Sequence, residues 1–439
     1  MVWTSHPVKQ IAGSVRAPGD KSCSHRALIL GGLATGITEI SGLLEGEDVI
    51  NTGRVMSALG ADTMRKGPGE WRVEGVGDAG LSQPAEDLDF GNSGTGSRLL
   101  MGVIAGYPIS ARLIGDESLS GRPMGRVTDP LETMGTRFEH DGSKTLPIIE
   151  HGSDDLKAIE YIPPHASAQV KSCLLLAGLR AKGTTTIHEP RQTRDHSEKM
   201  LRSFGAALTT EPHGEGVSVS IQGGQTLTAR ETRVPGDPSS AAFLAAAAMI
   251  SDTGGVVVEG VMSNQTRDGF FRAAALMGAN IGAEEQGEAA GERLIDMSFE
   301  AGQLKGCEIP VELVASMIDE FPILAVLAAF AEGETVIRGA AELRVKESDR
   351  ISAIVAMLRA NGVEVEERPD GFTVQGCNGR VPGGGHVKTH HDHRIAMSAL
   401  VLGTAAQSPA TIDDAEMIAT SYPDFMDHMA TLGADIRDV

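Results

Sequence analysis

Cysteine, aromatic residues and long apolar runs are all scarce in this chain of 439 residues. Its 4 cysteines, Cys23, Cys173, Cys307 and Cys377, form no CxxC pair, which argues against a disulfide framework and favours a reducing compartment. Aromatic residues make up only 4%, so an aromatic recognition surface is not expected. No apolar run approaches the ~20 residues that span a bilayer, and the first ten residues lack the apolar segment of an export signal. We therefore expect a cytoplasmic protein that does not insert into a membrane.

Positive charge is also in short supply, because 38 lysines and arginines face 59 acidic residues and the formal net charge is −21. A balance of this sign argues against a nucleic-acid partner or a general membrane-binding surface. Any anionic ligand must therefore be held by a local basic pocket. The length exceeds what one core normally fills, so two domains of roughly 200 residues are expected.

Glycine, by contrast, is abundant, with 54 residues, and six glycines end short helical patterns of one recurring type. They follow one another at intervals between 70 and 84 residues and are Gly60, Gly135, Gly205, Gly278, Gly362 and Gly433. A spacing this regular over the whole chain indicates one supersecondary unit repeated six times. Each repeat is predicted to contain a helix, a strand, a second helix and a strand pair, with hairpins at 65–75 and 366–376.

A second series of helices recurs at the same interval, and its members are apolar on all sides, which is typical of helices that are buried all round. The six runs are 26–34, 98–105, 173–179, 241–250, 321–331 and 395–403. Polar residues precede each run in register, marked by Ser22, Gly94, Gln169, Ser239, Asp319 and Asp392. Because helix N-termini carry free N–H groups and partial positive charge, several such starts around one cleft would form an anion site.

A repeated sequence motif indicates the domain boundary, since Ala-Pro-Gly-Asp-Lys-Ser at 17–22 resembles Val-Pro-Gly-Asp-Pro-Ser-Ser at 234–240. We expect one domain of three repeats over 21–235 and a second built from 1–20 and 236–439, with a hinge near 18–22 and 234–238. A strand within 8–16 would then pair with the C-terminal half. The glycine-rich stretches at 214–224 and 383–385 are alternative linkers.

Taken singly, each polar motif has an ordinary structural interpretation. The residues around Lys21 and Arg26 could cap a helix, the Gly-rich turn at 91–96 is weak evidence for a phosphate cradle, and the charges at 193–196 and 344–350 could form i,i+4 pairs. The run His-His-Asp-His at 390–393 suggests a metal, but Arg394 would repel a cation and no second ligand cluster stands out. We therefore expect no metal and no cofactor.

Taken together, the motifs place seven cations at helix starts of a strongly acidic chain: Lys21, Arg26, Arg122, Arg194, Lys346, Arg350 and Arg394. This concentration favours two highly anionic small ligands bound side by side. Asp319 and Glu347 add carboxylates whose pKa a cationic pocket would set for proton transfer.

These motifs, in this order from about residue 8 to the C-terminus, resemble one known family. They include Pro-Gly-Asp-Lys-Ser-x-Ser-His-Arg from 18, Gly-Asn-Ser-Gly-Thr from 91, Ser-Ala-Gln-Val-Lys from 167, Thr-Arg-Asp-His-Ser-Glu-Lys from 193, Ile-Asp-Glu-Phe-Pro from 318, Arg-Val-Lys-Glu-Ser-Asp-Arg from 344 and Asp-His-Arg-Ile-Ala-Met from 392. The chain resembles the 3-phosphoshikimate 1-carboxyvinyltransferases, or EPSP synthases, and among them the bacterial class related to glyphosate-tolerant members.

The resemblance implies an α/β (α+β) fold of two domains, each of three βαβαββ units, closing over an interdomain active site. It implies that shikimate 3-phosphate contacts Lys21, Ser22, Arg26, Ser167, Ala168, Gln169, Arg194, Asp319 and Lys346. It further implies that phosphoenolpyruvate is bound by Lys21, Asn92, Gly94, Thr95, Arg122, Gln169, Glu347, Arg350 and Arg394.

The implied activity is transfer of the enolpyruvyl group of phosphoenolpyruvate to the 5-hydroxyl of shikimate 3-phosphate, in aromatic amino acid biosynthesis. Catalytic roles fall to Asp319, Glu347, Lys21 and His393, with either Glu347 or Lys21 as proton donor to the methylene. The resemblance also implies a monomer. The segment 419–423 lacks a lysine that many relatives carry, so one cation toward phosphoenolpyruvate is missing at that place.

Two rival functions remain open on the sequence. A UDP-N-acetylglucosamine enolpyruvyl transferase would share the fold, but it normally carries a reactive cysteine in the segment matching 111–122, which has none here. A non-catalytic protein that binds phosphorylated metabolites is disfavoured, since pure anion binding gains nothing from Asp319 and Glu347.

Overall fold

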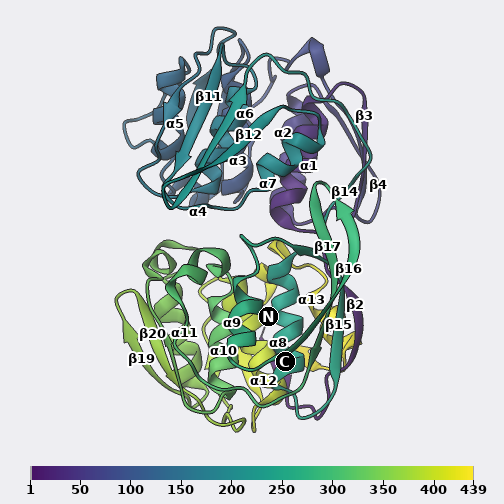
Figure 1. The fold of residues 1–439 in the computed structure, drawn as a ribbon, viewed down its shortest axis with the longest axis vertical. Coiled ribbons are helices and arrows are strands. Elements are labelled where there is room, and N and C mark those ends of the chain that lie inside the picture. Colours follow the sequence, from purple (N-terminus) through teal and green to yellow (C-terminus); the bar gives the residue numbers. More distant parts are fainter. Residues whose placement is uncertain (1, 439) are drawn as a thin grey trace. The chain divides into compact units, whose positions relative to one another are not determined.

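The computed structural model describes residues 2–438, and they divide into two compact units, which are described separately (Figure 1). Unit 1 comprises Met1–Pro18, Gly236–Glu288 and Arg293–Val439, and unit 2 comprises Gly19–Pro235 and Ala289–Glu292. Each unit contains three small sheets and three helices that are buried almost throughout. The α/β architecture with buried helices predicted from the sequence is confirmed.

The buried helices of unit 2 are α1 (Lys21–Leu33), α3 (Gly94–Ala105) and α6 (Ala168–Gly178). They have no polar face, because neighbouring elements cover them on every side, as the uninterrupted apolar runs require. Three amphipathic helices, α2 (Glu47–Ala58), α5 (Gly125–Met134) and α7 (His196–Ser203), alternate with them along the chain, and α4 (Glu117–Ser120) is a single turn.

The three sheets of unit 2 share one strand pattern. In each, a strand pairs on one side with an antiparallel pair of strands and on its other side with a short parallel strand. Their orders are β14 (Thr232–Arg233), β3 (Ile37–Ser41), β5 (Glu70–Glu74), β4 (Asp62–Gly67); β6 (Leu88–Asp89), β7 (Ser110–Ile114), β9 (Ile148–His151), β8 (Arg137–Glu139); and β10 (Glu160–Tyr161), β11 (Thr184–Glu189), β13 (Gly216–Gln222), β12 (Leu208–His213).

Unit 1 repeats this plan with the buried helices α8 (Pro238–Ile250), α10 (Phe321–Phe330) and α12 (His393–Ala405), and with the amphipathic helices α9 (Gly269–Leu276), α11 (Arg350–Ala360) and α13 (Phe425–Thr431). Its sheets have the orders β16 (Asn280–Ala289), β17 (Glu292–Glu300), β15 (Gly255–Ser263), β2 (Gly13–Arg16); β18 (Glu334–Ile337), β20 (Gly371–Gln375), β19 (Glu364–Arg368); and β21 (His386–Val387), β22 (Ala410–Ile412), β1 (Trp3–His6), β23 (Asp435–Asp438). The strand expected within 8–16 is β2, which pairs in parallel with β15.

The six glycines of the repeat signature all follow an amphipathic helix and all have positive φ, between 78° and 116°. This left-handed conformation ends a helix, and glycine adopts it without the Cβ penalty of other residues. Gly102 has a different role, because a Cβ there would lie 2.1 Å from the carbonyl oxygen of Cys173. Helices α3 and α6 therefore approach one another more closely than a larger side chain would allow.

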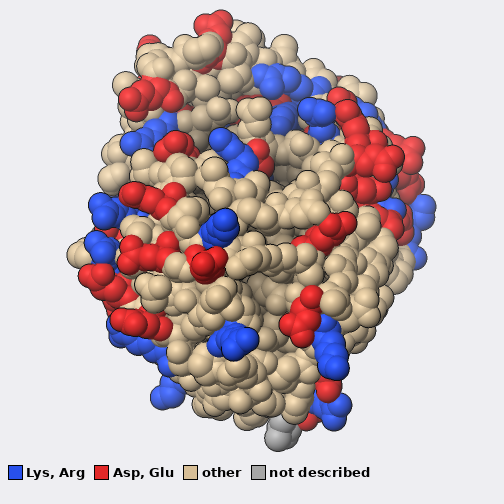
Figure 2. All heavy atoms as spheres, turned by 60° about the horizontal axis from the view of Figure 1, so that its bottom comes forward, with Lys and Arg blue, Asp and Glu red and all other residues tan. Residues whose placement is uncertain are grey.

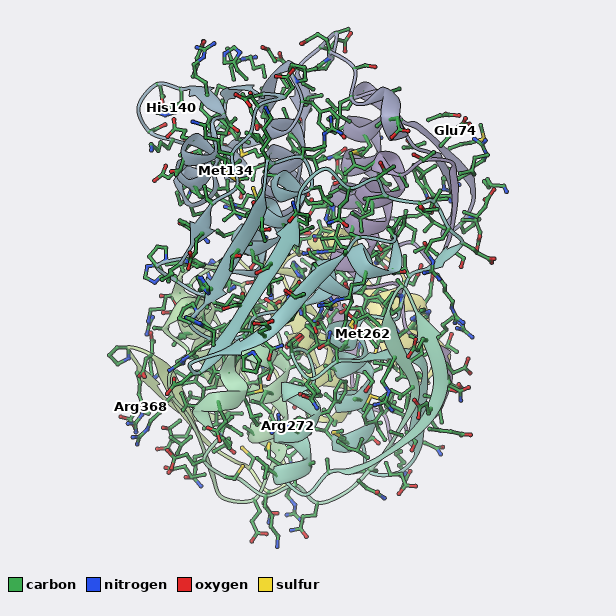
Figure 3. The ribbon with its side chains drawn as sticks, turned by 45° about the horizontal axis from the view of Figure 1, so that its top comes forward. Glu74, Met134, His140, Met262, Arg272 and Arg368 are labelled. Atoms are coloured by element: carbon green, nitrogen blue, oxygen red, sulfur yellow. The ribbon has the colours of Figure 1, made fainter. Side chains whose placement is uncertain are left out.

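Surface and interior are clearly separated within each unit. In Figure 3, Met134 lies inside unit 2 at the end of α5, whereas Glu74 lies at the outer edge of its unit. Arg272, on α9 of unit 1, is exposed. Figure 2 shows lysine and arginine side chains dispersed among acidic ones on one face of the molecule, without a broad basic patch. Among residues 2–438, no helix is long and apolar enough to cross a membrane.

Candidate active site

The buried helices of unit 2 begin at the residues that the sequence singled out. Asp20, Ser93 and Ser167 are their N-caps, and each side chain accepts a hydrogen bond from a backbone N–H in the first turn. The predicted residues of this unit all lie at or close to these starts or on the two loops that carry Arg122 and Arg194: Lys21, Ser22, Arg26, Asn92, Gly94, Thr95, Ser167, Ala168 and Gln169. Three helix N-termini thus supply the polar ends from which a site can be built.

Arg26 is buried in α1, with 5% of its surface exposed. Its guanidinium donates to Ser197 Oγ at 2.7 Å, to Ser172 Oγ at 2.7 Å and to the carbonyl oxygen of Ser22 at 2.9 Å. All three partners are neutral oxygens, and no carboxylate among residues 2–438 is bonded to Arg26. Burial lowers the pKa of Arg26. A buried cation without a carboxylate costs several kcal/mol, so an anionic ligand would stabilise this arrangement.

Arg122 is held in the same manner on the loop after α4. Its Nη2 donates to Asn92 Oδ1 at 2.6 Å and to Ser118 Oγ at 3.1 Å. The amide nitrogen of Asn92 donates in turn to Asp116 Oδ2 at 2.7 Å, which fixes the orientation of the amide. Arg122 is therefore oriented by neutral groups, while its positive charge stays available to a ligand.

Arg98, in the second turn of α3, was not among the predicted site residues. Its Nη1 donates to Gln169 Oε1 at 2.7 Å, and the amide nitrogen of Gln169 donates to Thr95 Oγ1 at 3.0 Å. Burial, together with the nearby charges of Arg126 and Arg122, lowers the pKa of Arg98 to about 10. Thr95, Gln169 and Arg98 form one chain of hydrogen bonds between α3 and α6. A cation inside an otherwise apolar helix was the sequence signal for this residue.

Lys21, the first residue of α1, forms an ion pair with Asp48 Oδ2 at 2.5 Å. Asp48 lies at the start of α2 and was also absent from the prediction, because nothing in the sequence connects the two helix starts. His25, one turn after Lys21, is fully buried, and burial lowers its pKa to about 3. Lys21 is therefore the cation at this helix start that is already balanced by a carboxylate.

In unit 1, Arg350 at the start of α11 is fully buried and contacts three carboxylates. Its guanidinium lies 2.8 Å from Asp392 Oδ2, 2.6 Å from Glu347 Oε2 and 3.3 Å from Asp319 Oδ1. Burial alone would lower the pKa of Arg350, but the three carboxylates raise it above its usual range. Asp392, the N-cap of α12, has its pKa lowered to about 2 by Arg350, against the opposing effect of burial.

The protonation states of the neighbouring groups follow from this cluster. Partial burial raises the pKa of Glu347, but the charge of Arg350 acts in the opposite direction and the net shift is below the usual value, so Glu347 is an ionised carboxylate near neutral pH. Burial lowers the pKa of His393 to about 3, with Arg394 acting in the same direction, so the imidazole is neutral. The predicted residues Asp319, Glu347, Arg350 and His393 are thus brought together around one guanidinium.

Three predicted cations occupy less enclosed positions. Lys346 pairs with Glu342 Oε1 at 2.9 Å, and its side chain is 23% exposed. Arg394 lies in the first turn of α12 and donates its backbone N–H to Asp392 Oδ1 at 3.0 Å. Arg194 is half-buried on the loop before α7.

A group of possible metal ligands lies elsewhere in unit 2. Asp195, His196 and Glu292 place their ligand atoms within 4.8 Å of one another. The ammonium of Lys199 lies 3.2 Å from Asp195 Oδ2 and 2.8 Å from Glu292 Oε2, so a lysine already supplies the positive charge there. Among the residues that the structure describes, 390–393 form no such group, and Asp392 binds Arg350.

Comparison with known proteins adds an independent line of evidence. The family model described as EPSP synthase (3-phosphoshikimate 1-carboxyvinyltransferase) matches residues 5–429. Among curated proteins, the 3-phosphoshikimate 1-carboxyvinyltransferase of Hyphomonas neptunium is 65% identical over 438 residues, covering 100% of both chains. That of Maricaulis maris is 53% identical and covers 99% of this chain and 96% of the relative. A solved EPSP synthase from Acinetobacter baumannii has a TM-score of 0.91 at 41% identity, covering 100% of both chains.

Proposed function

The chain belongs to the 3-phosphoshikimate 1-carboxyvinyltransferase family, the EPSP synthases, and from this premise we propose which of its side chains carry the reaction. It transfers the enolpyruvyl group of phosphoenolpyruvate to the 5-hydroxyl of shikimate 3-phosphate and releases phosphate. The hydroxyl adds to C2 of phosphoenolpyruvate while C3 gains a proton, and the tetrahedral adduct then loses phosphate and that proton.

Shikimate 3-phosphate is bound in this proposal by the residues Lys21, Ser22, Arg26, Ser167, Ala168, Gln169, Arg194, Asp319 and Lys346. The observation that carries it is the burial of Arg26 among hydroxyl and carbonyl oxygens, with no carboxylate bonded to it among residues 2–438. A phosphate group compensates such a cation, and its oxygens match the planar guanidinium two at a time.

Phosphoenolpyruvate is bound by Lys21, Asn92, Gly94, Thr95, Arg122, Gln169, Glu347, Arg350 and Arg394. Arg122 supports this assignment, because its charge is oriented by Asn92 and Ser118 and is not neutralised by either. Arg350 differs, since Asp319, Glu347 and Asp392 already surround it. We propose that Arg350 acts mainly by holding Asp319 and Glu347 in place and ionised, and that its contact with phosphoenolpyruvate is secondary to this role.

Proton transfer is assigned from the charge states. Asp319 is the base that takes the proton of the 5-hydroxyl. Glu347 is a carboxylate near neutral pH because Arg350 lowers its pKa, which supports its role as acceptor of the methyl proton in the elimination step. Lys21 carries an ammonium paired with Asp48, which supports it as the donor in the addition step. His393 is neutral and positions Glu347.

The decisive experiment measures phosphate release with shikimate 3-phosphate and phosphoenolpyruvate, and repeats it with UDP-N-acetylglucosamine as the acceptor. Release with the first acceptor alone is expected. Arg26→Gln should raise KM for shikimate 3-phosphate by at least about 100-fold, because a phosphate contact of a buried arginine is worth roughly 3 kcal/mol. Release with the UDP-sugar, or an unchanged KM in Arg26→Gln, would contradict the assignment. The monomeric state and cytoplasmic location expected from the sequence stay predictions.

A further inference from the structure

An ionic cluster that the reaction does not use lies in the interior of unit 2. Lys171, on α6, places its ammonium 2.8 Å from Glu189 Oε2 and 2.7 Å from Glu198 Oε1. The three side chains, called the Lys171 cluster below, have exposed fractions of 0%, 0% and 3%. Buried ion pairs are weak evidence for stability, because desolvation offsets most of the Coulombic gain. The function of the Lys171 cluster is therefore inferred from the residues that it contacts.

The Lys171 cluster lies beside the hydrogen bonds that hold Arg26, and both sets of contacts join α6 to α7. Ser172 follows Lys171 on α6, and Ser197 precedes Glu198 on α7. The two hydroxyls are 2.7 Å apart, and each accepts from the Arg26 guanidinium at 2.7 Å. Helices α6 and α7 are thus joined by an ion pair and, one residue away, by a hydroxyl pair that ends on Arg26. A change in the ion pair changes the spacing of the two hydroxyls.

The same cluster anchors the segment that carries Arg194. Residues 190–195 connect β11, which ends at Glu189, to α7, which begins at His196. Glu189 accepts from the backbone N–H of Thr193 at 3.3 Å and from the Thr193 hydroxyl. Since Glu198 lies in the first turn of α7, Lys171 binds one carboxylate on each side of this segment and restrains both of its ends.

The charges also link the cluster to Arg26. Lys171, Glu189 and Glu198 together carry a formal charge of −1, and the buried Arg26 brings the sum to zero. Burial lowers the pKa of Arg26, whereas the charges of Asp20 and Glu198 act in the opposite direction. One oxygen of Glu198, Oε2, is buried and accepts no hydrogen bond from residues 2–438, whereas the other, Oε1, is bound by Lys171.

We propose that Lys171 is a positioning residue that holds Arg26 and Arg194, through Glu198 and Glu189, in the geometry that binds the phosphate of shikimate 3-phosphate. It therefore sets the affinity for this substrate and leaves the affinity for phosphoenolpyruvate largely unchanged. This inference rests on the proposed function, which assigns both arginines to that phosphate.

The test compares KM for each substrate, kcat, and the thermal unfolding midpoint in four variants. Lys171→Met removes the central charge. Glu198→Gln keeps the shape of the side chain and weakens the link. The double variant Lys171→Met/Glu198→Gln keeps the formal charge of the cluster at −1 while removing the ion pair between α6 and α7. Lys182→Met is the matched control, because it breaks the exposed pair of Lys182 with Asp155 in the same unit.

We expect KM for shikimate 3-phosphate to rise at least about tenfold in the double variant and in Lys171→Met, as a displacement of about 1 Å in a binding group can produce. Glu198→Gln should show a smaller rise in the same direction, and KM for phosphoenolpyruvate should change less than about threefold in all three. A purely structural role would lower the unfolding midpoint and kcat per total protein while leaving both KM values alone.

The inference is overturned if the folded double variant or Glu198→Gln keeps the KM for shikimate 3-phosphate of the unaltered protein, or if both KM values rise together. Failure of the proposed function looks different. In that case the unaltered protein itself releases no phosphate from the two substrates, or Arg26→Gln leaves KM for shikimate 3-phosphate unchanged.

Discussion

Gly94→Ala tests the phosphoenolpyruvate half of the site with the smallest available change. Gly94 is the first residue of α3, and its φ lies outside the left-handed region that would require glycine. An added Cβ would lie 3.2 Å from Arg122 Nη1, 3.3 Å from Arg98 Nη1 and 3.8 Å from Leu119 Cδ1. The first two contacts are slightly too short, but they involve the mobile ends of arginine side chains, which can move by a few tenths of an ångström. We expect the protein to fold with an unfolding midpoint close to that of the unaltered protein.

The added methyl group is therefore expected to affect ligand binding more than protein stability. It displaces two guanidinium groups slightly and takes up space beside them, which crowds glyphosate more than the smaller phosphoenolpyruvate. We expect the inhibition constant for glyphosate to rise at least about tenfold, which corresponds to about 1.4 kcal/mol, while KM for phosphoenolpyruvate rises less than about threefold. Steady-state phosphate release at several inhibitor concentrations measures both quantities.

A matched control is Gly121→Ala, next to Arg122, where an added Cβ would meet only ordinary contacts at 3.6 and 3.7 Å. It should leave both constants unchanged. Equal inhibition of the Gly94→Ala and unaltered proteins would refute the steric argument. A parallel loss of both affinities would show that the displaced arginines, and not the space beside them, control binding.

Three further predictions each concern one residue of unit 2. Arg122→Lys should raise KM for phosphoenolpyruvate at least about tenfold without changing the unfolding midpoint, because an ammonium cannot reproduce a planar fork. Gly102→Ala should destabilise unit 2 by several kcal/mol, since its Cβ would lie 2.1 Å from the carbonyl oxygen of Cys173; calorimetry measures this loss. Both carboxylate oxygens of Glu150 are buried and have no hydrogen-bond partner in the described part of the chain, and burial raises the pKa of Glu150 well above 4.5. Its folded state thus holds a proton that the unfolded chain releases, so its contribution to stability falls as pH rises above about 4.5, and Glu150→Gln should gain stability relative to the unaltered protein between pH 5 and pH 9.

Each of these has an outcome that contradicts it. A similar KM in Arg122→Lys would show that one point charge suffices at this place. An unfolding midpoint of Gly102→Ala equal to that of the unaltered protein would mean that α3 and α6 can separate at little cost. A stability difference between Glu150→Gln and the unaltered protein that does not vary with pH would show that Glu150 has an ordinary pKa in the folded state.

Much of the fold could be predicted because its signals are local and repeated. Six apolar runs without a polar face predict six buried helices, and the glycine that ends each amphipathic helix adopts the left-handed conformation that its position requires. The short parallel edge strands were not predicted. Strands of two residues, such as β6 and β14, carry no periodicity of their own and are defined only by the strand beside them.

The polar helix starts were visible in the sequence, whereas their partners were not. Asp48, Arg98 and Lys171 lie on helices whose own patterns explain them as cap, solvated charge or chance, and only the packing of those helices pairs them with Lys21, Gln169 and Glu198. The separation along the chain between Arg26 and Ser197 is 171 residues, and no local pattern connects such positions. Pairing of buried charges is a property of the packed unit, so it needs a structure.

The arginines of the two units have different hydrogen-bond partners, and this difference explains how a chain of net charge −21 can bind two anions. In unit 2, the buried Arg26 and Arg98 and the half-buried Arg122 donate to neutral oxygens, so their charges remain available to a ligand. In unit 1, Arg350 is surrounded by three carboxylates, which suits proton transfer better than anion capture. Exposed acidic residues scattered over the surface are screened within about 8 Å at physiological ionic strength. Among residues 2–438 these arginines have no directly bonded carboxylate. They therefore act on a ligand at short range, where a low dielectric strengthens the interaction and the net charge of the chain has little effect.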